Sequence, residues 1–195
     1  MDKQSVNKDS AVIEKSPNKT VRRISITVAI LVAVFGVVLA TRKPASEQTV
    51  ASPLISRPAP AIIGTTLTGQ QVSLANYAGR FVLVNFFASW CTACQTEEKG
   101  LVGFAAKHRK AGDASVLGVI YDDTNSSAQA FLNRYGATYN AAVDPKGRIA
   151  LEYGVNGIPQ SYLIAPNGTI LTEIIGPVNQ ISLDQLINIA KSRGF

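Results

Sequence analysis

The sequence contains only two cysteines and one histidine among its 195 residues. A structural zinc site takes about four ligands, mostly cysteine and histidine, so the chain has too few of these residues for such a site. Cys91 and Cys94 have no other cysteine as an intramolecular partner. A purely structural disulfide between them would close a loop too short to constrain the unfolded chain strongly. These absences favour redox chemistry by the cysteine pair itself.

The folded part of the chain also lacks a strong net charge. Residues 53–195 carry eleven Lys/Arg and nine Asp/Glu, although the whole chain has a net charge of +6. The basic excess lies largely in residues 1–23, with six Lys/Arg against three Asp/Glu. A nucleic-acid-binding domain usually presents a basic face. Nucleic acid is therefore not an expected partner, and the sequence shows no internal repeat.

Residues 24–40 form a run of 17 residues without a charged side chain, and basic residues flank it. This length is the low end for a membrane-spanning helix, and the positive-inside rule places the basic N-terminus in the cytoplasm. A cleaved signal peptide is the alternative, because Val38-Leu39-Ala40 resembles a small-residue cleavage site. The long leading segment favours an uncleaved anchor. Either way, the rest of the chain is expected outside the cytoplasm.

Strand and helix patterns alternate in the rest of the chain, before a final hairpin and helix. Apolar runs predict strands over 81–87, 114–121, 141–143, 160–165 and 169–175, and a hairpin joining 62–63 to 71–74. Helical spacing and capping residues predict helices over 95–110, 127–135, 149–153 and 181–192. This order predicts an α/β domain with a mixed central sheet flanked by helices. The expected domains are a cytoplasmic basic tail (1–23), a single transmembrane helix (24–41), an extended proline-containing linker (42–56) and the folded domain (57–195).

The two cysteines lie at the junction between the strand 81–87 and the following helix. Unpaired backbone N–H groups and the helix dipole favour negative charge at this position, and the thiolate is the nucleophile in thiol–disulfide exchange. We therefore expect Cys91 at the exposed helix start as the attacking thiol. Cys94, one turn further, is expected to be shielded and to resolve the mixed disulfide. Apart from this redox-active disulfide, no cofactor or metal is expected.

Two motifs resemble a known fold. The segment WCTAC (90–94) after an apolar strand resembles the active site of the thioredoxin fold, and GVNGIPQSYLI (154–164) resembles its cis-proline loop and following strand. Together with the expected anchor, the chain most resembles the membrane-anchored TlpA/ResA/DsbE group of cytochrome c maturation proteins. The resemblance covers roughly residues 57–195. It implies a thioredoxin-like fold with an inserted strand–helix element, which 128–135 and 141–143 could supply.

The resemblance implies a role for several residues. Cys91 would be the nucleophile and Cys94 the resolving thiol, with Pro159 as the cis-proline beside them. Ile158 would offer backbone pairing to an extended substrate, and Trp90 would pack the site and form its rim. Alternatively, Pro159 could simply end a turn before a strand, and Trp90 could be mainly structural.

Glu97 occupies the place where this group keeps an acid near the active site. Buried there, it would have a raised pKa and could carry the proton of Cys94. The alternative is that Glu97 and Glu98 merely favour the first turns of the helix. His108, near the C-terminal end of the same helix, is interpreted as a helix-end residue rather than a ligand.

One position agrees with the TlpA/ResA/DsbE group, and two depart from it. Asn85 replaces the buried Asp of ordinary thioredoxins, which agrees with the anchored group. Gln160 departs from a Glu that some relatives carry after the cis-proline, and Thr92-Ala93 lacks the Pro that many members have between the cysteines. These last two departures leave the redox potential and the substrate preference open.

The function implied is that of an extracytoplasmic thiol–disulfide reductase. It would keep the haem-binding cysteines of apocytochrome c reduced and would itself be reset by a membrane electron donor of the CcdA/DsbD type. One alternative is an oxidoreductase of broader specificity that acts on exported proteins. A thioredoxin-fold copper chaperone is a second alternative, although such proteins typically use CxxxC with a distant histidine. A peroxidase would need a lone reactive cysteine in a different motif.

Overall fold

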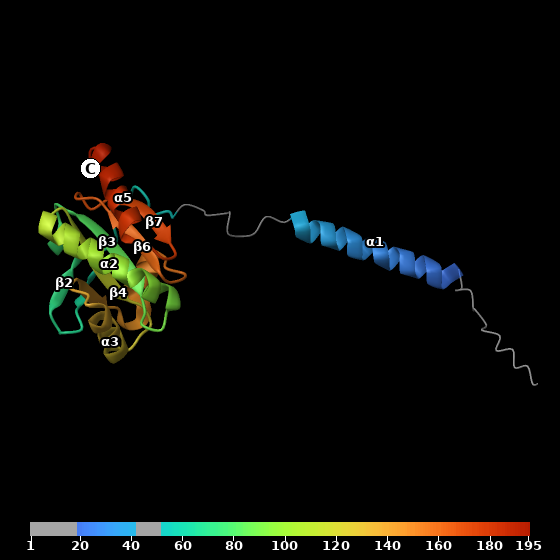
Figure 1. Cartoon of the computed structure of the whole chain (residues 1–195), viewed down its shortest axis with the longest axis horizontal. Helices are drawn as coiled ribbons and strands as arrows, with labels where there is room; N and C mark the ends of the chain where they lie inside the picture. The colour runs from blue at the N-terminus through green and yellow to red at the C-terminus, as the bar shows by residue number, and fades with distance from the viewer. Residues whose placement is uncertain (1–18, 42–51) are drawn as a thin grey trace, which may run out of the picture. The chain divides into compact units, whose positions relative to one another are not determined.

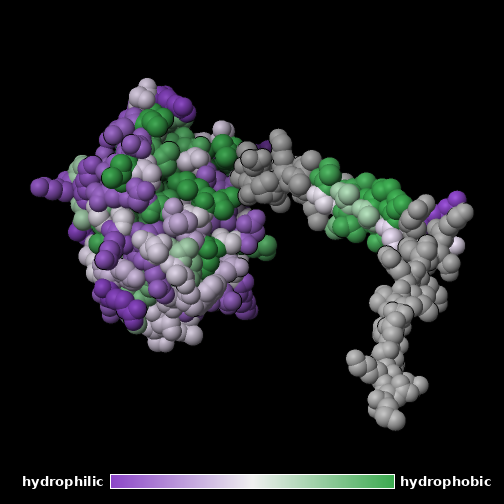
Figure 2. All heavy atoms as spheres, turned by 45° about the vertical axis from the view of Figure 1, so that its right-hand side comes forward, coloured by the Kyte–Doolittle hydropathy of each residue, from purple (hydrophilic) through white to green (hydrophobic). Residues whose placement is uncertain are grey.

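The computed structural model describes residues 19–41 and 52–195, which belong to two separate units. Residues 24–41, where the sequence predicts a transmembrane anchor, lie in helix α1 (Lys19–Thr41), whose described side chains are mostly exposed and hydrophobic (Figure 2). Within the described residues, no helix combines the length and the apolar character that crossing a membrane requires. The predicted basic tail and linker lie largely outside the described residues.

The globular unit is built on a five-stranded sheet in the order β5-β4-β3-β6-β7. The central strand β3 (Phe81–Phe87) is buried along its whole length. It pairs in parallel with β4 (Ala114–Ile120), which pairs in parallel with β5 (Asn140–Val143). On the other side, β6 (Gln160–Ile164) is antiparallel to β3 and to β7 (Ile170–Ile175). The mixed sheet predicted from the sequence is thereby confirmed.

Helices cover both faces of this sheet. Helix α2 (Thr92–Ala111) crosses in front of the sheet in Figure 1, and it packs with α5 (Gln180–Ser192) on one face. Helix α3 (Asn125–Tyr135) packs beside the N-terminal end of α2. The opposite face carries α4 (Arg148–Tyr153) and the hairpin of β1 (Ile63–Thr65) and β2 (Gln71–Ser73). The apolar spacing of each helix explains which side it buries.

The predicted elements are all present, with bounds that differ by a few residues. Within the globular unit, the largest difference is at α2, which starts at Thr92 rather than residue 95 because Cys91 itself caps the helix. The inserted element expected from the resemblance is formed by α3, which ends at Gly136 in the left-handed region, and by the edge strand β5. The sequence patterns missed two short 3₁₀ helices, η2 (Leu74–Tyr77) and η3 (Pro145–Gly147).

Candidate active site

Cys91 and Cys94 form a disulfide at the N-terminal end of α2, with their Cα atoms 5.2 Å apart. The chain leaves the buried strand β3, passes through a short loop, and enters α2 with Cys91 as the N-cap residue. The backbone N–H of Cys94 donates to Cys91 Sγ at 3.1 Å. A backbone donor and the positive end of a helix both favour a thiolate at this sulfur.

The two sulfurs differ less in exposure than the sequence suggests. Cys94 has no exposed surface, as predicted, but the expectation of an exposed Cys91 is wrong, because only 6% of this residue is accessible. The physical reason is the loop before β6, whose Ile158 carbonyl oxygen lies 3.8 Å from Cys91 Sγ. Phe87 and Ala88 pack in the same apolar cluster as both cysteines. Little of Cys91 is therefore open to a partner sulfur in the oxidised state.

Pro159 lies in this covering loop, directly before β6. The Ile158–Pro159 peptide bond is cis, so the conformation implied by the resemblance is confirmed. Pro159 is buried, Ile158 is half-buried, and the Pro159 carbonyl accepts a hydrogen bond from Gly176 N–H at 2.9 Å. The role of Ile158 in substrate pairing stays a prediction.

Trp90, the residue before Cys91, is 57% exposed, and its Nε1 donates to the carbonyl oxygen of Asp122 at 3.0 Å. Its expected roles in packing the site and forming its rim stay predictions. The neighbouring Asp123 accepts from the backbone N–H of Ser89 at 2.6 Å, and Gln95 Nε2 donates to the Ser89 carbonyl. These contacts hold the loop before Cys91. Local sequence patterns do not predict these contacts, because 34 residues separate Ser89 from Asp123.

Glu97 is a buried carboxyl group close to the disulfide in the helix, with 2% of its surface exposed. Its Oε1 accepts from Asn85 Nδ2 and its Oε2 accepts from Val178 N–H, both at 2.9 Å. Burial raises the pKa of Glu97 to about 7, although the two hydrogen bonds act in the opposite direction. Since Glu97 is buried with specific partners, the interpretation as a simple first-turn residue does not fit.

Glu98 is also buried, which contradicts its interpretation as a first-turn residue. It has no exposed surface, and its Oε1 accepts a hydrogen bond of 2.5 Å from Tyr139 Oη. Burial raises the pKa of Glu98 to about 7 against the effect of that hydrogen bond. A signal was present in the sequence, because Glu98 is four residues after Cys94 and thus shares its helix face.

Another polar cluster follows Pro159. The Gln160 amide Nε2 donates to Tyr162 Oη at 2.7 Å and to Glu173 Oε1 at 2.5 Å. Tyr162 Oη donates to the Tyr153 carbonyl at 2.6 Å. Some relatives carry a Glu at the position of Gln160. In this chain the carboxyl group of Glu173, on the neighbouring strand β7, lies beside Gln160 instead. Sequence reasoning missed Glu173, because strand pairing alone brings it to this place.

The single histidine of the chain lies away from the cysteine pair. His108 is near the C-terminal end of α2, where Asp113 and Asp184 bind its two ring nitrogens. Those two partners were not expected from the sequence. Within residues 19–41 and 52–195, no three His, Cys, Asp or Glu side chains converge as they would around a metal ion.

Comparison with known proteins identifies the family of this chain. The model of the AhpC/TSA family matches residues 55–172. The chain belongs to the AhpC/TSA family. This AhpC/TSA chain is 41% identical to the thiol:disulfide interchange protein CycY of Rhizobium leguminosarum bv. viciae, over 55% of the chain and 56% of CycY. The match thus spans little more than half the length of that relative.

Two further similarities are more extensive. The thiol:disulfide interchange protein DsbE of Allochromatium vinosum is 30% identical over 83% of this chain and 88% of DsbE. A solved structure from Chlorobium tepidum, assigned as a DsbE thiol:disulfide interchange protein, is 34% identical and covers 68% of this chain and 94% of its own, with a TM-score of 0.63. The thioredoxin-like fold and the resemblance to the DsbE group are thereby confirmed.

Proposed function

We propose that this AhpC/TSA-family chain is a thiol:disulfide oxidoreductase whose Cys91 and Cys94 cycle between dithiol and disulfide. The observation that carries the proposal is the Cys91–Cys94 disulfide at the start of α2, with the Cys94 N–H directed at Cys91 Sγ. The relatives named thiol:disulfide interchange proteins support the same chemistry.

In the reducing direction, the reaction takes two exchange steps. The Cys91 thiolate attacks one sulfur of a substrate disulfide, which forms a mixed disulfide and releases the first substrate sulfur as a thiolate. Cys94 then loses its proton and attacks Cys91 Sγ, which releases the second substrate sulfur. The substrate gains two electrons from the enzyme, one proton from Cys94 and one from solvent, which received a proton when Cys91 ionised, and the Cys91–Cys94 disulfide is formed. An external dithiol or membrane electron donor must then return two electrons and two protons.

Glu97 is proposed to take the proton from Cys94. It lies three residues after Cys94 on the same helix face, and a carboxyl group with a pKa of about 7 can both accept and release a proton near neutral pH. Its hydrogen bonds from Asn85 and Val178 hold the carboxyl group in place. The proton on Glu97 then passes to the departing substrate thiolate.

The proposed substrate approaches over the loop before β6. Ile158 is half-buried, and its carbonyl oxygen lies beside Cys91 Sγ, so an extended peptide would meet Ile158 and the Trp90 rim. We propose apocytochrome c as this substrate and a CcdA/DsbD-type membrane protein as the electron donor. The resemblance to the cytochrome c maturation group supports both proposals.

The proposed location of the domain is outside the cytoplasm, attached by a single N-terminal segment with the N-terminus in the cytoplasm. The support comes from the uncharged run 24–40 and its basic flanks. Labelling of the Cys91–Cys94 thiols in intact cells with a membrane-impermeant maleimide should succeed after reduction. Labelling only after cell lysis would contradict the location.

Two alternative functions can be distinguished from the proposed reductase. An oxidoreductase that forms disulfides in exported proteins would have a potential near −120 mV, whereas a dedicated reductase should lie near or below about −270 mV. A copper chaperone is not favoured, because His108 is bound between two aspartates near the opposite end of α2 from the cysteines.

The test of the proposed function is a trapping experiment with matched cysteine variants. Reduced Cys94→Ser should form a mixed disulfide with an oxidised CxxCH peptide, because Cys91 attacks and nothing resolves the product. Cys91→Ser should form far less of this adduct, because Cys94 is buried. The wild-type chain should reduce the peptide without accumulating the adduct. Equal trapping by both variants, or no reduction by the wild type, would overturn the proposal.

A further inference from the structure

Glu98 is a buried acid that the proposed exchange steps do not use. It has no exposed surface, and Tyr139 donates the one hydrogen bond that reaches its carboxyl group. Among the described residues, its second oxygen, Oε2, has no hydrogen-bond partner. Glu97, the adjacent residue, has a partner on each oxygen. The two neighbouring acids are therefore held in different ways.

Glu98 lies close to the redox centre through the geometry of α2. Residues three and four positions apart share a helix face, so Glu97 and Glu98 both follow Cys94 on the face that meets the sheet. Tyr139 packs against the apolar cluster that contains Cys94. Its ring also lines two open pockets at the edge of the sheet. Tyr139 thus joins Glu98 to the surroundings of Cys94.

The surroundings of Glu98 favour its neutral form. An ionised carboxylate buried with a single hydrogen bond loses much of its solvation energy. Burial raises the pKa of Glu98 and the Tyr139 hydrogen bond lowers it, and within the described residues Glu98 makes no ion pair. The nearest ionisable residues on its own helix are Cys94, Glu97 and the exposed Lys99; Tyr139 precedes β5, and α3 carries Arg134 and Tyr135.

The charge of Glu98 also acts on Glu97. An ionised Glu98 raises the pKa of Glu97, although burial and the hydrogen bonds from Val178 and Asn85 have larger effects. When Glu98 is neutral, Glu97 can be a carboxylate that accepts a proton from Cys94. When Glu98 is ionised, Glu97 holds its own proton more tightly.

We propose that Glu98, anchored by Tyr139, is a positioning residue whose charge state sets the range of pH in which Glu97 can take up the proton of Cys94. The proposal rests on the proposed function and deepens it, because it concerns the proton that leaves Cys94 before the second exchange step. No additional oxidant or reductant is involved. The proton moves from Cys94 Sγ to a Glu97 oxygen, and the Cys94 electron pair forms the bond to Cys91 Sγ.

The direct test reads Glu97 without using turnover. The carboxyl ¹³C shift of Glu97 is titrated by NMR in the oxidised full-length chain, in the wild type and in Glu98→Gln. Gln matches neutral Glu in size and keeps an acceptor for Tyr139, so the fold should be retained. We expect the Glu97 midpoint to fall by several tenths of a pH unit, because removing a neighbouring negative charge favours the ionised form of Glu97.

Two further variants make the result specific. Tyr139→Phe removes the hydrogen bond that favours the charged form of Glu98, so the Glu98 midpoint should rise and Glu98 should remain neutral to higher pH. Glu152→Gln is the matched control, because Glu152 is an exposed acid on α4 that pairs with Arg148. It should leave the Glu97 titration unchanged. An unchanged Glu97 midpoint in Glu98→Gln would overturn the proposal.

A kinetic measurement ties the titration to the reaction. The single-turnover rate at which the reduced chain reduces an oxidised peptide is followed over pH, and its profile in Glu98→Gln should shift in the same direction as the Glu97 midpoint. A shifted NMR titration with an unshifted rate profile would overturn the link to Cys94. If the wild type reduces no peptide at any pH, the proposed function itself fails, which the cysteine trapping experiment detects independently.

Discussion

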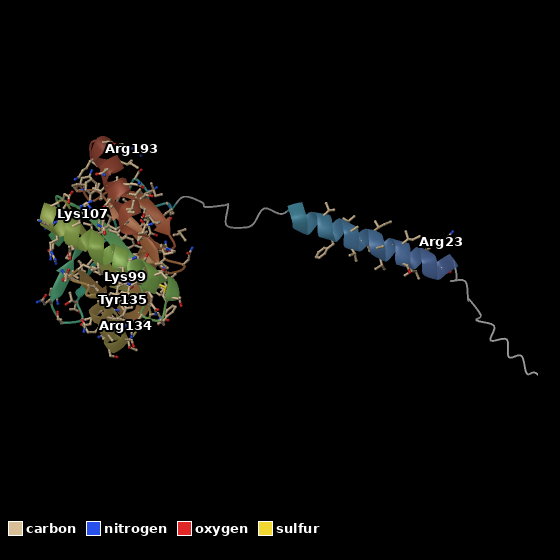
Figure 3. The ribbon with its side chains drawn as sticks, in the orientation of Figure 1. Arg23, Lys99, Lys107, Arg134, Tyr135 and Arg193 are labelled. Carbon is tan, nitrogen blue, oxygen red and sulfur yellow. A yellow bond between two sulfur atoms is a disulfide. The ribbon has the colours of Figure 1, made fainter. Side chains whose placement is uncertain are left out.

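Acids lie in opposite environments near the two ends of helix α2. Near the N-terminal end, Glu97 and Glu98 are buried and make no ion pair within the described part of the chain, and burial raises the pKa of each to about 7. Near the C-terminal end, Asp113 and Asp184 bind the two nitrogens of His108 at 2.7 Å and 3.0 Å. In Figure 3, the labels Lys99 and Lys107 mark the corresponding halves of the helix.

The second group of acids is charged because cations reach it. Lys191 Nζ lies 2.6 Å from Asp113, and Lys107 Nζ lies 2.8 Å from Asp184. Burial acts to raise the pKa of Asp113, but the hydrogen bonds from Lys191 and His108 outweigh it and lower the pKa to about 2. At Asp184, burial also acts to raise the pKa, but the hydrogen bonds from Lys107 and His108 outweigh it and lower the pKa.

The comparison separates two uses of a carboxyl group. Acids that lack cations inside the domain keep a proton that they can exchange near neutral pH, which suits the redox end. Acids paired with cations at the edge stay charged and fasten α5, which carries Asp184 and Lys191, to the end of α2. One helix thereby links a proposed proton-transfer site to a structural ion-pair cluster.

The largest effect should come from replacing Glu97 at the redox end. Glu97→Gln keeps the shape of the side chain but cannot accept the Cys94 proton, so the turnover of a peptide disulfide should fall about 100-fold, the lower range for general acid–base catalysis. The measurement is dithiothreitol-driven peptide reduction over pH. Turnover within a factor of two of the wild type would show that Glu97 is not the proton acceptor.

Replacing His108 should lower the stability of the fold but leave peptide reduction unchanged, whereas replacing Glu97 should lower peptide reduction. His108→Ala removes the group between two aspartates and its contact with the Phe104 ring, whose centroid is 4.3 Å away. We expect a loss of about 2 kcal/mol in the free energy of unfolding, as for a buried group whose partners are left unpaired, and unchanged peptide reduction. Urea unfolding measures the first and the turnover assay the second. The exposed neighbour Lys110→Ala is the control, and an equal loss of stability there would refute the role of His108.

The pH dependence of stability should reflect both ends of the helix. For Glu97 and Glu98, the folded pKa of about 7 lies above the ordinary value of 4.5, so the folded state keeps protons that the unfolded state releases. Their contribution is therefore present at low pH, and it is lost as pH rises from about 4.5 to about 7. For Asp113, the folded pKa of about 2 lies below 3.8, so its contribution is lost as pH falls through that window.

Stability should thus be greatest near pH 4 to 5, between the two windows. Urea unfolding of the oxidised chain at a series of pH values tests this expectation. Combining Glu97→Gln with Glu98→Gln should reduce the loss of unfolding free energy as pH rises toward neutral. Asp113→Asn should reduce only the loss of unfolding free energy at acid pH. A pH profile that neither change affects would contradict the comparison.

The smallest effect should come from the partly exposed cation at the structural end. Lys191→Ala removes the ion pair with Asp113 but leaves His108 bound to the same carboxylate. Since exposed ion pairs contribute little, the free energy of unfolding should fall by less than about 1 kcal/mol, and the loss should shrink at high salt. A loss as large as that of His108→Ala would mean that the lysine dominates the cluster.

The local patterns of the sequence determined most of the fold. Apolar runs located the five strands of the central sheet, and glycine correctly marked the end of α3 at Gly136. The spacing of Cys91 and Cys94 at a strand-to-helix junction predicted the disulfide at the start of α2. These features succeed because strands, caps and the spacing along a helix depend on residues close together in the sequence.

The environment of each ionisable group was decided only by the tertiary structure. The contacts of Asn85 with Ser161, of Glu98 with Tyr139 and of His108 with Asp184 join residues 41 to 76 positions apart. The low exposure of Cys91 likewise comes from the distant Ile158 loop. No local pattern encodes such contacts, because a carboxyl group gains or loses its charge through burial and through partners that packing brings together. The sequence therefore determined the strands, the helices and the position of the cysteine pair, and the fold determined the surroundings that raise or lower the pKa of each acid.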